Sequence, residues 1–333
     1  MSDLKGIEIT DLLGLSEPLT KLLETVSCGV GKLYEPTHIK RIAKAKAEEI
    51  KIISDAVTDN LNLPVNYQNG FVGIDSMDAS DLAQRAQNRF LFQQMKKQQN
   101  IESVVSDAYL ELEGKNGTSR EPVDEDWVSS FFDFVANVSN EQMQKIWGKI
   151  LAGEVIQPGS FSIRTLDILR KLTQREAQLF SSFAPYVLRC YADSTKSDYD
   201  YFLLCDETEE KTLSMKYGYS FFNINLLDDA GLFSSNSMIY IGHDVDCGER
   251  IMFEGREKVI EITNKNSHSV KVGHSAYLLT ENGKELYNAI ISMNSDVPPD
   301  QYYEDCTFAI MNSELLMTKE ERAKIESSII SQG

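Results

Sequence analysis

The chain has 333 residues, and its 51 acidic side chains outnumber its 33 Lys and Arg, which gives a formal net charge of -18 at pH 7. This length predicts about two or three domains. Such an acidic surface repels phosphate backbones, so we expect no nucleic-acid binding without a local basic patch. Five cysteines stand far apart with no C-x-x-C pair, which argues against a zinc site or a disulfide framework. No secretory leader and no apolar run of ~20 residues is evident, so we expect a cytoplasmic protein. We also expect that it binds no cofactor.

The first predicted segment, residues 1–73, is an amphipathic helical segment that ends in a turn-rich linker at 60–73. Helical spacing of apolar residues predicts helices near 19–33 and 39–57. The second helix presents four basic side chains away from its apolar stripe: Lys40, Arg41, Lys44 and Lys51. One interpretation is a contact with an anionic membrane surface or with another subunit. The other is a helical hairpin whose lysines are simply solvated.

Residues 74–190 are predicted to form a helical core domain. A long helix runs from about 78 to 112, and further helices follow at 127–138, at 141–155 with Ser139 as its cap, and from the capping box of Thr173 and Glu176. Trp127 and Trp147 belong to an aromatic set at helical spacing, which favours core packing over a ligand site. Gly153 predicts a close helix approach, and Glu154 is expected to pair with Arg164 across the turn at 157–160 as a structural clamp.

Residues 191–295 are predicted to be a winged-helix-like α+β domain, and 296–333 a tail with a helix from Thr318. Strands are expected at 201–205, 237–241, 250–253, 258–262 and 275–279, with helices at 219–231 and 281–293. The first of these helices resembles the DNA-reading helix of a winged helix, but it carries Asp228 and Asp229 and no Lys or Arg. Carboxylates facing phosphates oppose binding, so a structural or protein-binding module is favoured.

A crowded run at 242–248 holds the residue types that could bind a transition metal: His243, Asp244, Asp246 and Cys247. A glycine-bounded polar loop is the competing interpretation, and we favour it, since neighbouring residues of a strand point to opposite faces. No linear catalytic motif occurs in the chain. A metal-dependent nuclease site near the carboxylates of Asp246, Glu254, Glu257 and Glu261 stays an alternative.

The most distinctive run is LAGE-x-x-x-PGSFS-x-RTL at 151–166, with an upstream YEP-x-x-I at 34–39. Through these motifs the chain resembles an uncharacterised bacterial protein family of unknown function. The resemblance implies no activity and no catalytic residue. Families of this appearance are associated with phage defence and abortive infection.

These observations predict a mainly helical protein with an α+β part: a helical N-terminal half followed by a winged-helix-like C-terminal domain. We expect a non-enzymatic protein that forms a homo-oligomer or binds a protein partner, in a setting such as antiviral defence. A winged-helix DNA-binding regulator and a metal-dependent nuclease with a cryptic site are the alternatives.

Overall fold

The computed structural model describes residues 16–30, 65–68, 71–74, 82–192, 200–205, 212–234, 239–292, 296–312 and 317–331. The chain forms two compact units, 1–166 and 167–333. Their boundary lies within helix α7 (Ile163–Lys171), whereas the sequence analysis placed a boundary at 190. The division into four segments stays a prediction. The basic side chains Lys40, Arg41, Lys44 and Lys51, and the predicted helix that carries them, lie outside the described residues.

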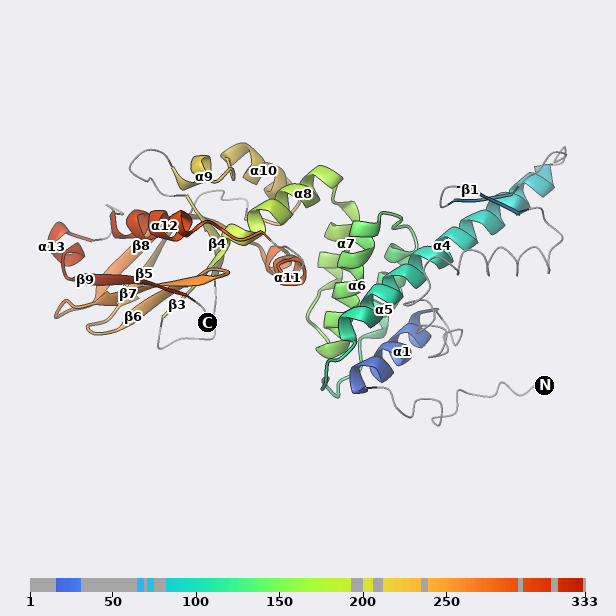
Figure 1. The fold of residues 1–333 in the computed structure, drawn as a ribbon, viewed down its shortest axis with the longest axis horizontal. Helices are drawn as coiled ribbons and strands as arrows, with labels where there is room; N and C mark the ends of the chain where they lie inside the picture. Colours follow the sequence, from blue (N-terminus) through green and yellow to red (C-terminus); the bar gives the residue numbers. More distant parts are fainter. Residues whose placement is uncertain are drawn as a thin grey trace. The chain divides into compact units, whose positions relative to one another are not determined.

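The first unit is helical in its described part, apart from one small hairpin (Figure 1). Its elements are α1 (Glu17–Val30), β1 (Val65–Gln68), β2 (Phe71–Ile74), α4 (Leu82–Leu112), α5 (Glu125–Val135) and α6 (Glu141–Ile156). Helix α4 packs along α6, and α1 packs against α4, α5 and α6. Apolar faces at helical spacing bury the core between them, as the sequence predicted for this half of the chain.

Two details of this unit differ from the sequence analysis. The segment interpreted as a linker contains the antiparallel pair β1 and β2, whose sequences flank Asn69-Gly70. Asn-Gly is a strong hairpin signal because both residues tolerate positive φ. The cap of α6 is Asn140 rather than Ser139, since the Asn140 side chain accepts a hydrogen bond from the Met143 amide at 3.1 Å. An amide oxygen at this position satisfies a first-turn N–H that has no partner within the helix.

The second unit contains a seven-stranded antiparallel sheet in the order β5-β8-β4-β3-β6-β7-β9. The strands are β3 (Leu188–Ala192), β4 (Asp200–Leu204), β5 (Ile239–Val245), β6 (Arg250–Glu254), β7 (Lys258–Asn264), β8 (Val270–Leu278) and β9 (Ile325–Ser331). Strand register places one set of alternating side chains on the same face, and these are buried: Leu188, Cys190, Phe202, Phe253, Ile260, Val272 and His274. We call this the inner face of the sheet.

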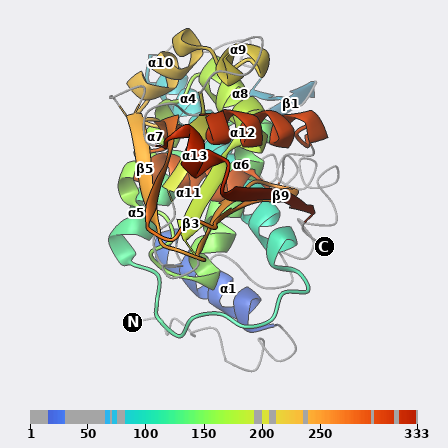
Figure 2. The same ribbon diagram turned by 90° about the vertical axis from the view of Figure 1, so that its left-hand side faces the viewer.

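The second unit also contains helices. They are the end of α7, α8 (Gln174–Phe183), the short 3-10 turn η2 (Ala184–Tyr186), α9 (Leu213–Lys216), α10 (Phe221–Asp229), α11 (Glu281–Ile290), α12 (Asp300–Asn312) and α13 (Lys319–Arg322). Helix α12 packs against β7, β8 and β9, and both views show it lying along the sheet (Figures 1 and 2). The capping boxes predicted at Thr173 and Thr318 are both present.

The tail helix predicted from Thr318 begins as expected but is short. The helix after Thr318 is only Lys319–Arg322, and the chain then enters strand β9. The sequence Ile-Glu-Ser-Ser-Ile-Ile-Ser contains β-branched residues and pairs with β7 over its whole length, from Lys258↔Ser331 to Asn264↔Ile325. Local capping thus started a helix that strand pairing stops after four residues. The fold class is mainly helical with an α+β part, as expected at that level.

Candidate functional site

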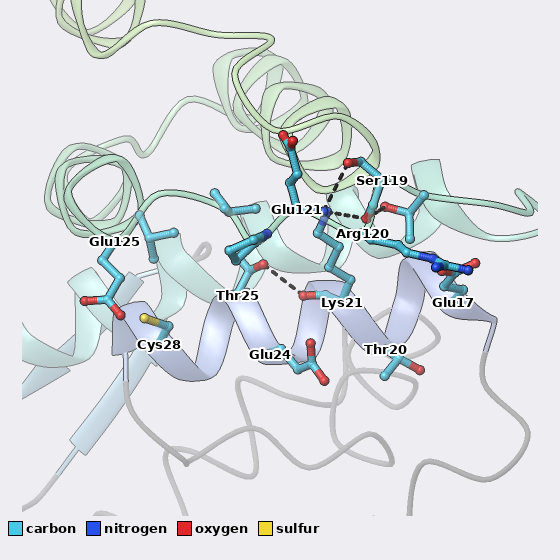
Figure 3. Close-up of a pocket in the computed structure, with 14 residues that line it drawn as sticks. Glu17, Thr20, Lys21, Glu24, Thr25, Cys28, Ser119, Arg120, Glu121 and Glu125 are labelled. Carbon is cyan, nitrogen blue, oxygen red and sulfur yellow. Dashed lines mark hydrogen bonds between the residues drawn. The ribbon is translucent and has the colours of Figure 1, made fainter.

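A groove of about 570 Å³ runs beside α1 and the loop at 118–125 (Figure 3). Lys21 reaches across it, and its ammonium group donates a hydrogen bond to the Ser119 carbonyl oxygen at 2.9 Å. Burial lowers the pKa of Lys21, against the attraction of nearby carboxylates. Four of the lining carboxylates are exposed: Glu17, Glu24, Glu121 and Glu125. Because Lys21 is held by the main chain, the groove presents mainly negative charge to solvent.

The aromatic side chains of α5 and α6 form the core of the first unit. Trp147 is fully buried and makes edge-to-face contacts with Phe131 at 5.4 Å and Phe134 at 6.3 Å between ring centroids. Trp127 stacks on Phe131 at 5.0 Å. The two indole N–H groups differ, because that of Trp127 donates to the Phe161 carbonyl oxygen at 2.7 Å, while that of Trp147 has no hydrogen-bond partner among the described residues. This set is packed interior and offers no ligand surface.

The motif at 151–166 builds a tight turn around one buried carboxylate. Glu154 is 1% exposed, and its two oxygens accept the main-chain amides of Gly159 at 2.6 Å and Phe161 at 3.0 Å. Gly159 has φ +82°, a conformation that favours glycine. The ring of Phe161 lies over Gly153, where an added Cβ would come within 2.8 Å of the ring. These four motif residues therefore serve the turn, and the close approach at Gly153 is to the Phe161 ring rather than to a helix.

The predicted partner of Glu154 lies elsewhere. Arg164 is exposed on α7 and makes no ion pair within the part of the chain that the structure describes. Ser162 caps α7, since its hydroxyl accepts the Thr165 amide at 3.2 Å. Main-chain amides thus take the role that the sequence analysis gave to Arg164. A buried carboxylate is better served by fixed N–H groups than by a long exposed side chain, which loses rotamer freedom on pairing.

The four residues considered as metal ligands do not assemble into a site among the described residues. His243 and Asp244 are neighbours in β5 and point to opposite faces, while Asp246 and exposed Cys247 lie in the following turn. No group of three or more His, Cys, Asp or Glu positioned to hold a metal ion occurs among the described residues.

The carboxylates considered for a nuclease have other partners. Glu254 forms an ion pair with Arg189, and Glu261 pairs with Arg250 at 3.5 Å. These two acids therefore contribute to cross-strand pairing in the sheet.

Three large apolar side chains of the second unit, two of them aromatic, are exposed on α9 and α10, which are adjacent in both views (Figures 1 and 2). Met215 is 71% exposed, Phe221 51% and Phe222 83%, and the two phenyl rings contact each other edge to face at 6.2 Å. We call these three residues the aromatic surface. Isolated exposed apolar residues are common, but a cluster of large ones marks an interaction site.

Two tyrosines between α9 and α10, the half-buried Tyr217 and the buried Tyr219, hold the aromatic surface in place. The Tyr219 hydroxyl donates to the Leu204 carbonyl oxygen at 2.8 Å, and Tyr217 donates to Asp305 of α12 at 2.6 Å. Lys216 also pairs with Asp305 at 2.6 Å. Burial alone would raise the pKa of Asp305, but its hydrogen bonds from Lys216 and Tyr217 hold it below the ordinary value. The exposed rings therefore project from a fixed segment.

Comparison with known proteins decides the family. The family described as "Protein of unknown function (DUF2806)" matches residues 84–306, which is more than half of the chain. The chain belongs to this family. The expectation of an uncharacterised family is thereby confirmed, and the matched region runs from α4 into α12. No curated protein and no solved structure matches the chain.

Within this DUF2806 member, the turn motif at 151–166 and the aromatic surface both lie in the matched region, whereas the YEP segment at 34–36 lies before it. None of the helices that the structure describes is long and apolar enough to cross a membrane. Sequence analysis missed the aromatic surface, because Phe221 and Phe222 look like the apolar start of an amphipathic helix. Their adjacency is no signal of exposure, because the neighbouring Phe131 and Phe132 of α5 are both buried, so no local pattern distinguishes this pair.

Proposed function

We propose that this protein is a non-catalytic interaction protein that self-associates through the aromatic surface. The observation that carries the proposal is the exposure of Phe222, 83%, on a segment anchored at Tyr217 and Tyr219. Exposed Phe and Met on a rigid support are favoured at interface centres, since little side-chain entropy is lost when they are covered.

The charge distribution favours a second copy of this chain as the partner. The chain has 51 acidic residues, but none of them lies between Leu213 and Leu227, the stretch that carries the aromatic surface. The one basic side chain there, Lys216, is paired with Asp305. Two copies can therefore meet around Met215, Phe221 and Phe222, with Asp228 and Asp229 about two turns away at the other end of α10.

The size of the surface limits the affinity. Three large side chains at these exposures supply roughly 300–400 Å² per subunit, below the roughly 800 Å² per partner of a standard interface. We therefore expect a dissociation constant of roughly micromolar order. The net charge of -18 on each copy adds long-range repulsion, which salt screens. Added salt should consequently strengthen the association, the opposite of its effect on binding to anionic membranes or nucleic acid.

The experiment is light scattering of the full chain from about 1 to 100 μM, a range that brackets the expected affinity, at low and at high salt. We expect the mass of the wild type to rise with concentration and with salt. The Phe222→Ser variant should have the mass of a monomer under the same conditions. Phe90→Ser is the matched control, because Phe90 is 59% exposed but lies on α4. A monomer under all conditions, or equal loss in the two variants, contradicts the proposal.

The basic N-terminal segment supplies a second arm of this test. Self-association that survives Phe222→Ser but is lost on deletion of residues 1–60 would assign the contact to the segment with Lys40, Arg41, Lys44 and Lys51 instead. Flotation of the full chain with anionic vesicles tests the membrane interpretation of the same segment. The setting in antiviral defence stays a prediction based on the resemblance of the sequence.

The winged-helix interpretation of 221–291 also stays a prediction. The chain order α10, strands, α11 is the one expected, but the intervening strands belong to the larger seven-stranded sheet. Helix α10 has no Lys or Arg, and burial together with the neighbouring Asp229 raises the pKa of Asp228. A helix of this charge disfavours the DNA-binding regulator and favours a protein-binding role.

A further inference from the structure

A cysteine and two histidines meet on the inner face of the sheet. The Cys190 Sγ of β3 lies 3.5 Å from the His243 Nε2 of β5, within hydrogen-bond range for sulfur. The His243 ring lies nearly parallel to that of His274 in β8, with 5.4 Å between the ring centroids. Phe202 stacks on His274 at 4.6 Å, and Phe253 contacts it edge to face at 5.3 Å. The surroundings of the three polar side chains are therefore largely aromatic.

Curvature of the sheet brings the cysteine and His243 together. Strands β3 and β5 do not pair, because β4 and β8 lie between them in the sheet. Their side chains can touch only if the sheet bends around its inner face. The Asn264 side chain on β7 donates to the Val245 carbonyl oxygen on β5 at 2.8 Å, a second link between non-adjacent strands. The Cys190–His243 contact is thus a product of the tertiary structure.

His274 marks this place as unusual. It is fully buried, and neither of its ring nitrogens has a hydrogen-bond partner among the described residues. Buried polar atoms without partners are rare in folded proteins and call for an explanation such as a functional role. Burial, with a smaller contribution from His243, lowers the pKa of His274 to about 3. His274 is therefore neutral near pH 7, and the half-buried His243, in contact with the thiol, is the imidazole placed to take up a proton.

We propose that Cys190 is a nucleophilic thiol, activated by His243, and that it is a site of modification by small hydroperoxides. The Cys190 proton passes to His243 Nε2, and the thiolate sulfur attacks one peroxide oxygen. An S–O bond forms as the O–O bond breaks, and the leaving oxygen takes the proton back from His243. The sulfur is oxidised to a sulfenic acid, and the hydroperoxide is reduced to an alcohol, or to water where it is hydrogen peroxide. This inference is independent of the aromatic surface.

The other cysteines provide internal controls. Cys28 and Cys247 are exposed, while Cys205 and Cys306 are buried like Cys190. If exposure alone governed reactivity, Cys28 and Cys247 would react first. Activation by His243 reverses this order for reagents small enough to reach a thiol that is 3% exposed.

The size of the effect follows from the thiolate fraction. An ordinary cysteine with a pKa of about 8.5 is only a few per cent thiolate at pH 7. Full ionisation would raise the rate roughly 30-fold, and the lower nucleophilicity of a more acidic thiol reduces this to roughly 3-fold.

The experiment treats the native full chain at pH 7 with limiting hydrogen peroxide and then unfolds it in urea with dimedone, so that every sulfenic acid is trapped regardless of burial. Peptide mass spectrometry reads each cysteine. We expect Cys190 to be trapped roughly 3-fold faster than Cys28 and Cys247. His243→Asn should remove this excess and leave Cys28 and Cys247 unchanged in the same spectrum. Equal trapping of Cys190 in wild type and His243→Asn, or trapping of the exposed cysteines first, overturns the proposal.

A measurement on the wild type alone covers the case in which His243→Asn does not fold. In concentrated urea the His243 contact is lost, so the excess reactivity of Cys190 over Cys28 should disappear. A buried thiol without activation behaves in the opposite way, because unfolding exposes it and increases its labelling. An increase for Cys190 relative to Cys28 in urea therefore also overturns the proposal.

Discussion

The two tryptophans of the first unit allow the contribution of one hydrogen bond to be measured. Trp147→Phe and Trp127→Phe make the same change, from indole to phenyl, in side chains that are 0% and 3% exposed. The indole N–H of Trp147 has no partner among the described residues, whereas that of Trp127 donates to the Phe161 carbonyl oxygen at 2.7 Å. Only Trp127→Phe therefore removes a hydrogen bond.

The two variants should differ in stability for this reason. The smaller ring leaves a cavity at either site and lowers the free energy of unfolding by roughly 1–2 kcal/mol. Loss of the bond to Phe161 adds roughly 1–2 kcal/mol for Trp127→Phe, because the buried carbonyl oxygen loses its donor. Trp147→Ala empties the whole site and should cost roughly 3–5 kcal/mol.

Urea unfolding followed by far-ultraviolet circular dichroism measures these differences. Because the chain has two units, the shift should appear in the transition of the first one. Equal midpoints for Trp127→Phe and Trp147→Phe would show that the Trp127–Phe161 bond contributes nothing. A Trp147→Ala variant that melts within about two degrees of wild type would refute the burial of Trp147, since several kcal/mol correspond to a larger shift.

Glu154→Gln should lower the free energy of unfolding by roughly 1–3 kcal/mol in the same assay, because one acceptor oxygen facing the amides of the turn becomes a donor. An unchanged urea midpoint would mean that the turn does not need the carboxylate. His274 has a folded pKa of about 3 against an ordinary 6.5, so the unfolded chain binds more protons between these values. The free energy of unfolding should therefore fall as the pH is lowered through this window, by roughly 2–3 kcal/mol between pH 6.5 and 4.5. Urea midpoints of the His274→Phe variant, which lacks the titrating group, should fall less over the same range. Fluorescence polarisation at low salt should detect no DNA binding, since Arg250 pairs with Glu261 and Arg256 with Glu257. Salt-sensitive submicromolar binding that is lost on changing both arginines would favour the interpretation as a DNA-binding regulator.

Local patterns in the sequence determined much of the helical half. Apolar side chains at helical spacing and the capping box at Thr173 depend only on residues within a few positions of each other, so they can be recognised without a fold. The motif at 151–166 was recognised as a unit for the same reason. The sequence predicted a structural clamp between Glu154 and Arg164. In the structure, Glu154 instead accepts hydrogen bonds from the main-chain amides of Gly159 and Phe161.

Tertiary structure decided the features that join distant parts of the chain. Strand β9 replaced the predicted tail helix because it pairs with β7, some sixty residues earlier. Cys190 and His243 meet only because the sheet bends, and no spacing in the sequence encodes that contact. Whether Phe222 is buried or exposed depends on how Tyr217 and Tyr219 anchor the segment before it. Local patterns specify which elements can form, whereas pairing and burial between distant segments select which of them form and which side chains are left in solvent.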